Sequence, residues 1–165
     1  MGDILQSFFF SPSHASSGGW VWGIGPVVQP PTGTHPQLTT HLWGLGPTAV
    51  VLRQINGWTY GLHLIIFSLL LAIIEPPINS TYLQPFLAYT TKSAITTTLN
   101  SESTYYWKPN LWAVPLNLSV SKVTKIGQQM ISIGAGVRYW AESTTFSPSG
   151  FAGRLILTFL FPEKS

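Results

Sequence analysis

The chain has 165 residues, of which 45% are hydrophobic, 13% are aromatic and only 8% are charged, and it contains no cysteine. This composition excludes a disordered chain, which combines high net charge with few aromatic residues, and it excludes a disulfide scaffold or a thiolate metal site. The net charge of +3 comes from eight basic and five acidic residues scattered along the sequence, which argues against a nucleic-acid partner. The length indicates a single domain over residues 1–165.

In chain order, the sequence predicts β-strands. Segments rich in aromatic and β-branched residues are bounded by turn residues such as Asn56-Gly57, a strong hairpin signal. The expected strands are Ile4–Phe10, Gly19–Val28, Leu45–Gln54, Trp58–Ile74, Thr81–Thr90, Ala94–Trp107, Trp112–Ser121, Ile131–Glu142 and Phe151–Phe161. Residues 29–41 are the one long polar loop, and no segment combines a helix start, an amphipathic stripe and a helix stop. We therefore predict an all-β fold, an antiparallel meander of about nine strands.

Most of these segments alternate at every second residue. Between Trp112 and Ser121, large apolar residues at even positions alternate with Ala, Pro, Asn and Ser at odd positions. Successive side chains of a strand point to opposite faces, so each strand has one apolar face and one polar face. The polar faces carry Ser, Thr, Asn and Gly and only a few charges, namely Glu102, Arg138, Glu142 and Arg154.

One apolar run, Leu64–Ile74, does not alternate. A helix that spans a bilayer needs about 20 residues, and this run is shorter even when it is extended back to Tyr60. We therefore favour a strand here and keep a transmembrane helix as the alternative. The segment Met1–Ser7 has neither a basic region nor a cleavage site, so no signal peptide is expected in it.

An all-β chain of this kind has two structural solutions. A soluble sandwich buries one face of each strand and covers the other with charge, whereas a membrane barrel turns its apolar face to lipid and encloses a polar lumen. The second faces here lack the many Lys and Glu residues of a soluble sheet, and Trp and Tyr lie near segment ends, as in the aromatic girdles of barrels. This pattern favours an outer-membrane β-barrel and leaves a soluble all-β binding module as the alternative.

Several short motifs, in order along nearly the whole chain, resemble those of a known family. The motifs are Gln6–Pro12, Gly18–Pro26, Trp43–Ala49, Tyr82–Tyr89, Gly134–Tyr139 and Leu157–Pro162. They are similar to the bacterial outer-membrane transporter family labelled "MetA-pathway of phenol degradation". The resemblance implies a β-barrel in the bacterial outer membrane, a passive transporter of small, hydrophobic or aromatic solutes, with lipid as its surroundings and no cofactor.

The chain also departs from the family pattern. Family members carry a signal peptide and further strands before the stretch that resembles Asp3–Pro12, so we expect this chain to be the C-terminal part of a longer one. The run Leu64–Pro77 replaces a polar segment of the family, and a compensated local frameshift is our hypothesis for it. A degenerate reading frame whose product does not fold is a further alternative.

The end of the chain resembles the signal that the barrel assembly machinery recognises by strand pairing. Such signals are amphipathic strands with alternating hydrophobic residues and a terminal aromatic residue. The matching residues here are Gly153, Leu155, Leu157, Phe159 and Phe161. The alternative is an ordinary edge strand.

No pattern in the sequence points to an enzyme. There is no nucleophile elbow, phosphate loop or dinucleotide fingerprint, and the five carboxylates are spread over the chain. The histidines have no metal-ligand spacing on a shared face, although His35 and His41 bracket a loop, so we expect neither a catalytic site nor a metal.

The site residues that we predict are therefore those of a barrel lumen. Charge on a lipid-facing surface is costly, so Glu102, Arg138, Glu142 and Arg154 are expected to face the lumen and to pair with one another. They would either line a path for a small solute or brace the barrel interior.

Overall fold

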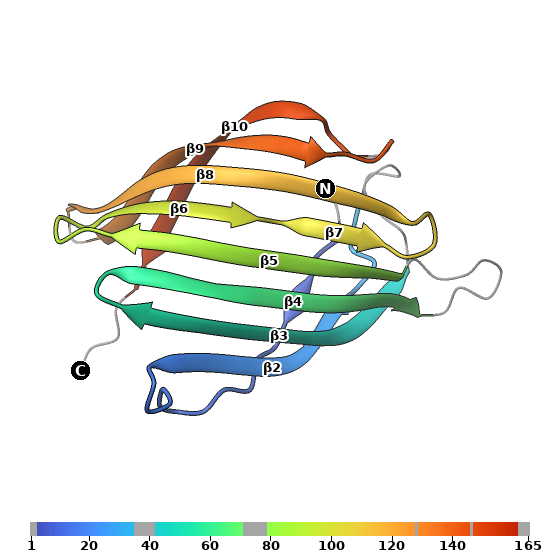
Figure 1. Ribbon diagram of the computed structural model, residues 1–165, viewed down its shortest axis with the longest axis horizontal. Coiled ribbons are helices and arrows are strands. Elements are labelled where there is room, and N and C mark those ends of the chain that lie inside the picture. Colours follow the sequence, from blue (N-terminus) through green and yellow to red (C-terminus); the bar gives the residue numbers. More distant parts are fainter. Residues whose placement is uncertain (1–2, 35–41, 71–78, 128, 146, 162–165) are drawn as a thin grey trace.

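The computed structural model describes residues 3–34, 42–70, 79–127, 129–145 and 147–161. These residues form one antiparallel sheet of ten strands (Figure 1). The strands are β1 (Gln6–Ser7), β2 (Trp20–Gln29), β3 (Trp43–Ile55), β4 (Trp58–Leu70), β5 (Asn79–Thr90), β6 (Ile95–Ser101), β7 (Ser103–Tyr106), β8 (Leu111–Ile126), β9 (Gln129–Glu142) and β10 (Gly150–Leu160). The predicted all-β antiparallel meander is confirmed.

The strands follow one another across the sheet in chain order. β6 and β7 together occupy one position between β5 and β8, so the described sheet has nine positions, in agreement with the predicted number. Each strand is antiparallel to its neighbours. Because nine is odd, β1 and β10 run in the same direction at the two edges of the sheet.

The β3–β4 hairpin shows how local sequence sets the register. Asn56 and Gly57 have φ angles of 49° and 84°, and left-handed conformations at both central residues are the mark of a tight hairpin turn. The predicted hairpin is therefore confirmed, and Ile55 pairs with Trp58.

The apolar run beginning at Leu64 belongs to a strand as far as the described residues extend. β4 continues to Leu70, and residues 71–78, which include the rest of the run and of the proposed frameshift, lie outside the described residues. In the part of the chain that the structure describes, no helix is long and apolar enough to cross a membrane. The long loop predicted over residues 29–41 is described only as far as residue 34, and Gln29 itself ends β2.

The first strand is shorter than predicted. Only Gln6–Ser7 forms a strand, although the backbone N–H groups of Phe8 and Phe10 still donate to the carbonyl oxygens of Pro26 and Ile24, at 2.9 and 2.8 Å. Pro26 has no N–H with which to return a hydrogen bond, so the regular ladder stops beside it.

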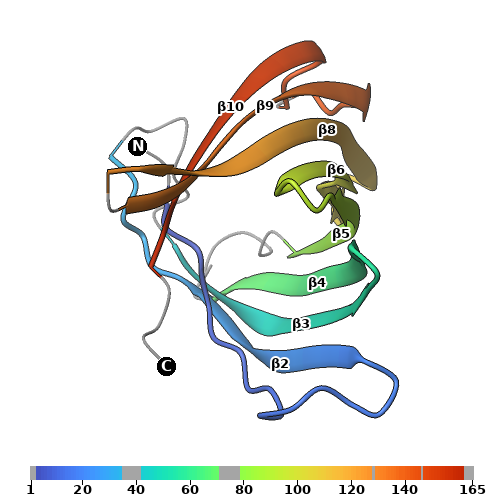
Figure 2. The ribbon, with the colours of Figure 1, turned by 90° about the vertical axis from the view of Figure 1, so that its left-hand side faces the viewer.

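The sheet is strongly curved, with a concave and a convex face (Figure 2). One lateral row of register partners, Leu87, Leu99, Leu118 and Val137, lies on the convex face. The neighbouring row, Phe86, Asn100, Asn117 and Arg138, lies on the concave face. The faces predicted for these central strands agree with this arrangement.

Many large apolar residues of this sheet are exposed, unlike those in the core of a soluble domain. Among the described residues, the buried hydrophobic residues are Val27, Ile65, Ala113 and Ile131, whereas the buried polar residues are Thr48, Ser101, Ser103, Asn117 and Thr144. In β8, Asn117 is 3% exposed and its neighbour Leu118 is 48% exposed. The exposed apolar side chains therefore lie mainly on the convex face, whereas the concave face buries both polar residues (Thr48 and Asn117) and apolar residues (Val27, Ile65 and Ala113). Ser101 and Ser103 are buried on the convex side, next to the break between β6 and β7.

Candidate functional site

Glu102 lies at a break in the sheet, between β6 and β7. On one side its backbone N–H donates to the carbonyl of Pro115 in β8, at 3.2 Å. On the other side lies β5. There Phe86 pairs with Asn100 of β6 and Leu83 pairs with Ser103 of β7, so Pro85 lies in the stretch between the two pairings. Neither proline can donate a ladder hydrogen bond, so the strand is interrupted where the two prolines flank it.

The carboxylate of Glu102 joins two arginines from more distant strands. Its Oε2 accepts from Nη2 of Arg138 in β9, and its Oε1 accepts from Nη1 of Arg154 in β10, at 3.1 Å. The side chains of Glu102 and Arg138 are 20% and 23% exposed, and that of Arg154 is 44% exposed. Strands are spaced by about 4.8 Å, so Glu102 and Arg154 would be about 14 Å apart across a flat sheet. Curvature and long side chains close this gap.

Two asparagines extend this group along the concave face. Nε of Arg138 donates to Oδ1 of Asn117 at 2.5 Å, and Nδ2 of Asn117 donates to Oδ1 of Asn100 at 2.7 Å. The guanidinium carbon of Arg138 also lies 5.4 Å from the ring centroid of Trp140, a cation–π distance. We call Asn100, Glu102, Asn117, Arg138 and Arg154 the charge network.

Glu142 is not part of the charge network, contrary to our expectation. A register shift between Val114 and Pro115 makes Val114 pair with Glu142 and Pro115 pair with Trp140. The additional residue in β9 at this β-bulge turns Glu142 to the face of Val114, away from Arg138. Glu142 is exposed, and no ion pair joins it to another described residue. Strict alternation cannot predict such a bulge.

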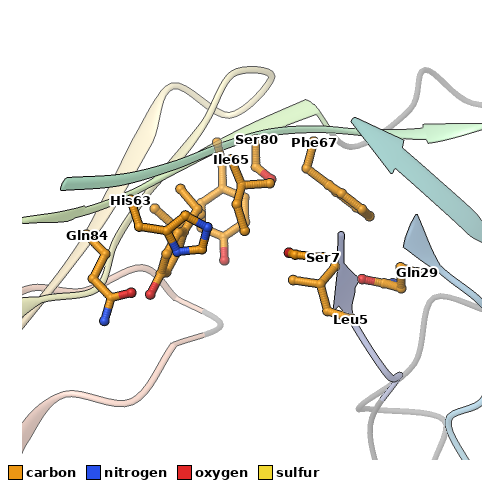
Figure 3. A pocket seen from close by; sticks show the side chains of 11 residues that line it. Leu5, Ser7, Gln29, His63, Ile65, Phe67, Ser80 and Gln84 are labelled. Atoms are coloured by element: carbon orange, nitrogen blue, oxygen red, sulfur yellow. The ribbon is translucent and has the colours of Figure 1, made fainter. Parts of the chain in front are cut away.

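Next to the charge network, the concave face contains a cavity of about 570 Å³ (Figure 3). Figure 3 shows Leu5, Ser7 and Gln29 on one side of it and His63, Ile65 and Gln84 on the other. The N-terminal segment with the end of β2, and the middle of the sheet, therefore form two sides of it. The complete lining consists of Leu5, Ser7, Gln29, His63, Ile65, Phe67, Ser80, Tyr82, Gln84, Thr104 and Tyr106.

His63 is held in a defined orientation in the cavity wall. Its Nε2 lies 2.9 Å from Oγ1 of buried Thr48, and this hydroxyl donates to the carbonyl of Leu64 at 3.2 Å. The Thr48 hydroxyl has one proton and donates it to the carbonyl of Leu64. It therefore accepts in its hydrogen bond with His63, and Nε2 of the imidazole donates. The rings of Phe9 and Tyr82 pack edge-on against the imidazole, with centroids 5.7 and 5.8 Å away.

Phe67 is positioned by a glycine in the neighbouring strand. A Cβ atom at Gly44 would lie 1.8 Å from Cζ of Phe67, so the ring occupies the space that any other residue would fill. The run Trp43-Gly44-Leu45-Gly46 therefore marks crowding between β3 and β4, as expected for glycines inside strands. The cavity was not predicted from the sequence. The sequence feature that could have indicated the cavity is the row of polar side chains at every second position of β5, Ser80, Tyr82 and Gln84.

The residues of the predicted assembly signal lie at the free edge of the sheet. Gly153, Leu155, Leu157 and Phe159 share the convex face of β10, and Phe161 follows the strand. Leu155 is 91% exposed. Their role in assembly stays a prediction.

The arrangement offers hydrogen bonding, ion pairing and apolar contact. Within the described residues, no three His, Asp or Glu side chains lie close enough together to hold a metal ion. His35 and His41, which bracket the predicted loop, lie outside the described residues. Comparison of the chain with protein-family models, with curated proteins and with solved structures found no match.

Proposed function

We propose that this chain forms part of the wall of a bacterial outer-membrane β-barrel that provides a passive path for small solutes. The single observation that carries the proposal is the row of exposed large apolar residues on the convex face, among them Leu99, Leu118, Val137 and Leu155. A soluble protein rarely exposes an apolar patch larger than a few hundred Å². Lipid is the solvent in which this distribution is stable.

The lengths of the strands support the same proposal. β3 and β4 have 13 residues each, and β8, β9 and β10 have 16, 14 and 11. A tilted strand needs about 9–11 residues to cross the hydrocarbon core of a bilayer. The long strands are therefore sufficient for a membrane crossing.

Aromatic residues gather at both ends of these strands. Near the β3–β4 turn, the rings of Trp58 and Tyr89 lie 4.8 Å apart. Near the β7–β8 turn, Tyr105 contacts Trp107 and Trp112, at centroid distances of 4.9 and 4.8 Å. Aromatic girdles at the two membrane interfaces have this arrangement.

The direction of the edge strands limits how such a barrel would close. Since β1 and β10 run in the same direction, pairing them directly would create a parallel seam. A second copy in the same membrane orientation would also place parallel strands at each seam. An entirely antiparallel barrel that contains this sheet therefore includes an odd number of further strands.

The placement of the sheet in a membrane can be tested with single cysteines, because the chain has none of its own. Leu118→Cys on the convex face and Ser119→Cys on the concave face are neighbours in β8 and serve as matched probes. Each variant is refolded into lipid vesicles and labelled with an environment-sensitive dye. We expect lipid-bound quenchers to reach the dye at position 118 and aqueous quenchers to reach it at position 119.

A soluble binding module would give a different result. The chain would then stay in solution without detergent or lipid, and lipid-bound quenchers would reach neither position. That outcome would reject the membrane barrel.

The charge network favours a second role, bracing of the interior, because Glu102, Asn117 and Trp140 all contact Arg138. Arg138→Ala separates the two roles in planar bilayers. Changed conductance or ion selectivity is expected for a solute path, with or without a loss of stability, whereas unchanged conductance with a lower free energy of unfolding indicates bracing alone.

A further inference from the structure

The cavity on the concave face differs in chemistry from the charge network beside it. Among the described residues that line it, none is Lys, Arg, Asp or Glu. Two acids lie close to the lining: Glu102, between β6 and β7, binds Arg138 and Arg154, and Asp3 accepts from the side chain of Gln29 at 3.4 Å and from the backbone N–H of Gly33 at 2.8 Å. An ion in the cavity would therefore lose hydration without a charged side chain in the described lining to pair with it, which is costly.

One wall of the cavity presents unused hydrogen-bonding groups. Ser80, Tyr82 and Gln84 project from alternate positions of β5, and Thr104 pairs with Tyr82 across the sheet. No hydrogen bond joins the side chains of Ser80, Tyr82, Gln84 or Thr104 to other described residues. These hydroxyl and amide groups are available to a ligand that both donates and accepts.

The remaining wall is apolar. Leu5 comes from the segment before β1, and Ile65 and Phe67 come from β4. Ile65 is buried, and Phe67 is locked over Gly44, so this surface is formed before any ligand arrives. Small-molecule sites combine such an apolar lining with a few polar groups, in cavities of about 300–1,000 Å³.

We propose that this cavity is a binding subsite for uncharged small molecules that carry a hydroxyl or amide group on a compact apolar body. The polar group would face Tyr82, Gln84 and Thr104, and the apolar body would face Leu5, Ile65 and Phe67. This inference deepens the proposed function, on which it rests for its place along a solute path, by naming the class of solute.

The test uses three probes of nearly equal shape: cyclohexylmethanol, cyclohexanecarboxylate and cyclohexylmethylammonium. Binding to the whole chain in lipid nanodiscs is measured by ligand-observed NMR, with protein-free nanodiscs as the baseline. We expect the alcohol to bind about tenfold or more tightly than either ion, because only the ions are desolvated without a partner. Equal binding of all three probes would overturn the proposal.

Two substitutions locate the bound alcohol. Thr104→Phe fills the cavity and is expected to abolish binding, whereas Leu99→Phe, on the convex face of the adjoining strand, leaves binding unchanged. Gln84→Leu removes an amide and nearly keeps the volume, so binding is expected to weaken about threefold to tenfold. If Thr104→Phe does not fold, Gln84→Leu decides the matter, and an unchanged affinity in that variant rejects the subsite.

Failure of this inference can be told apart from failure of the proposed function. Loss of selective binding with a lipid-exposed dye at position 118 would reject the subsite and keep the barrel. Selective binding with a water-exposed dye at position 118 would keep the subsite and reject the barrel.

Discussion

The two faces of the β8–β9 ribbon carry the same backbone but have opposite surfaces. On the convex face, Leu118 and Val137 are register partners and both are exposed. On the concave face, the next pair is Asn117 and Arg138, whose side chains hydrogen-bond each other. In a soluble sheet the covered face would be the apolar one. The contrast teaches that, in this ribbon, the covered side is held by polar contacts and the open side is apolar, as the proposed contact with lipid requires.

The largest effect is expected from placing a charge on the convex face. Leu118→Arg should lower the free energy of unfolding in lipid vesicles by about 2–4 kcal/mol, the cost of a basic side chain on a lipid-facing surface. Ser119→Arg, one residue away on the concave face, should change it little. Urea unfolding followed by tryptophan fluorescence measures both. Equal losses in the two variants would remove the distinction between the faces.

A smaller effect is expected from Glu102→Gln, which removes the negative charge between two arginines. Because Glu102 and Arg138 are mostly covered, we expect a loss of about 1–3 kcal/mol in the free energy of unfolding. Glu142→Gln is the control, since Glu142 is exposed and outside the charge network, and it should stay within about 0.5 kcal/mol. Similar losses in both variants would mean that the bulge in β9 does not separate the two acids.

The packing of the two faces can be compared with alanine. A Cβ atom at Gly46 would lie 1.8 Å from the backbone oxygen of Ile66, whereas at Gly153 it would meet no atom within 4 Å. Gly46→Ala should therefore destabilise the fold by about 1–3 kcal/mol, as overpacking does. Gly153→Ala should be neutral or stabilise by up to about 1 kcal/mol. Denaturation midpoints test this, and a destabilising Gly153→Ala would show that the edge of β10 is covered.

The smallest effect is expected at Arg154, the most exposed member of the charge network. Arg154 is more exposed than Arg138 and has a single ion pair, so Arg154→Gln should cost less than about 1 kcal/mol. Arg138→Gln also loses the contacts with Asn117 and Trp140 and should cost more. Unfolding in low and high salt measures the difference, and a larger loss at Arg154 would contradict this order.

Much of the fold could be predicted because its signals are local. Alternation at every second residue, together with turn residues at the segment ends, identified the strands from β2 to β10, with β6 and β7 predicted as one strand. The Asn56-Gly57 pair identified the β3–β4 turn. The two left-handed conformations of that turn depend on only two residues, so they can be inferred from a short stretch of sequence. The end of β1 was predicted less well, because it depends on Pro26 in the partner strand.

The site could be predicted only in part. Alternation placed Glu102, Arg138 and Arg154 on one face, but their contacts cross several strands and depend on curvature. Glu142 was assigned to the same face because the β-bulge opposite Val114 and Pro115 has no simple pattern in β9. The cavity was missed because its walls come from segments as distant in sequence as Leu5 and Tyr106.

The sequence by itself determined the fold class, an antiparallel all-β chain with apolar and polar residues at alternate positions. It could do so because strand periodicity is a property of each segment alone. Only the tertiary structure decided which face is covered, which charges meet, and that β1 and β10 run in the same direction. These properties arise from register, bulges and sheet curvature, which depend on pairs of strands rather than on single segments.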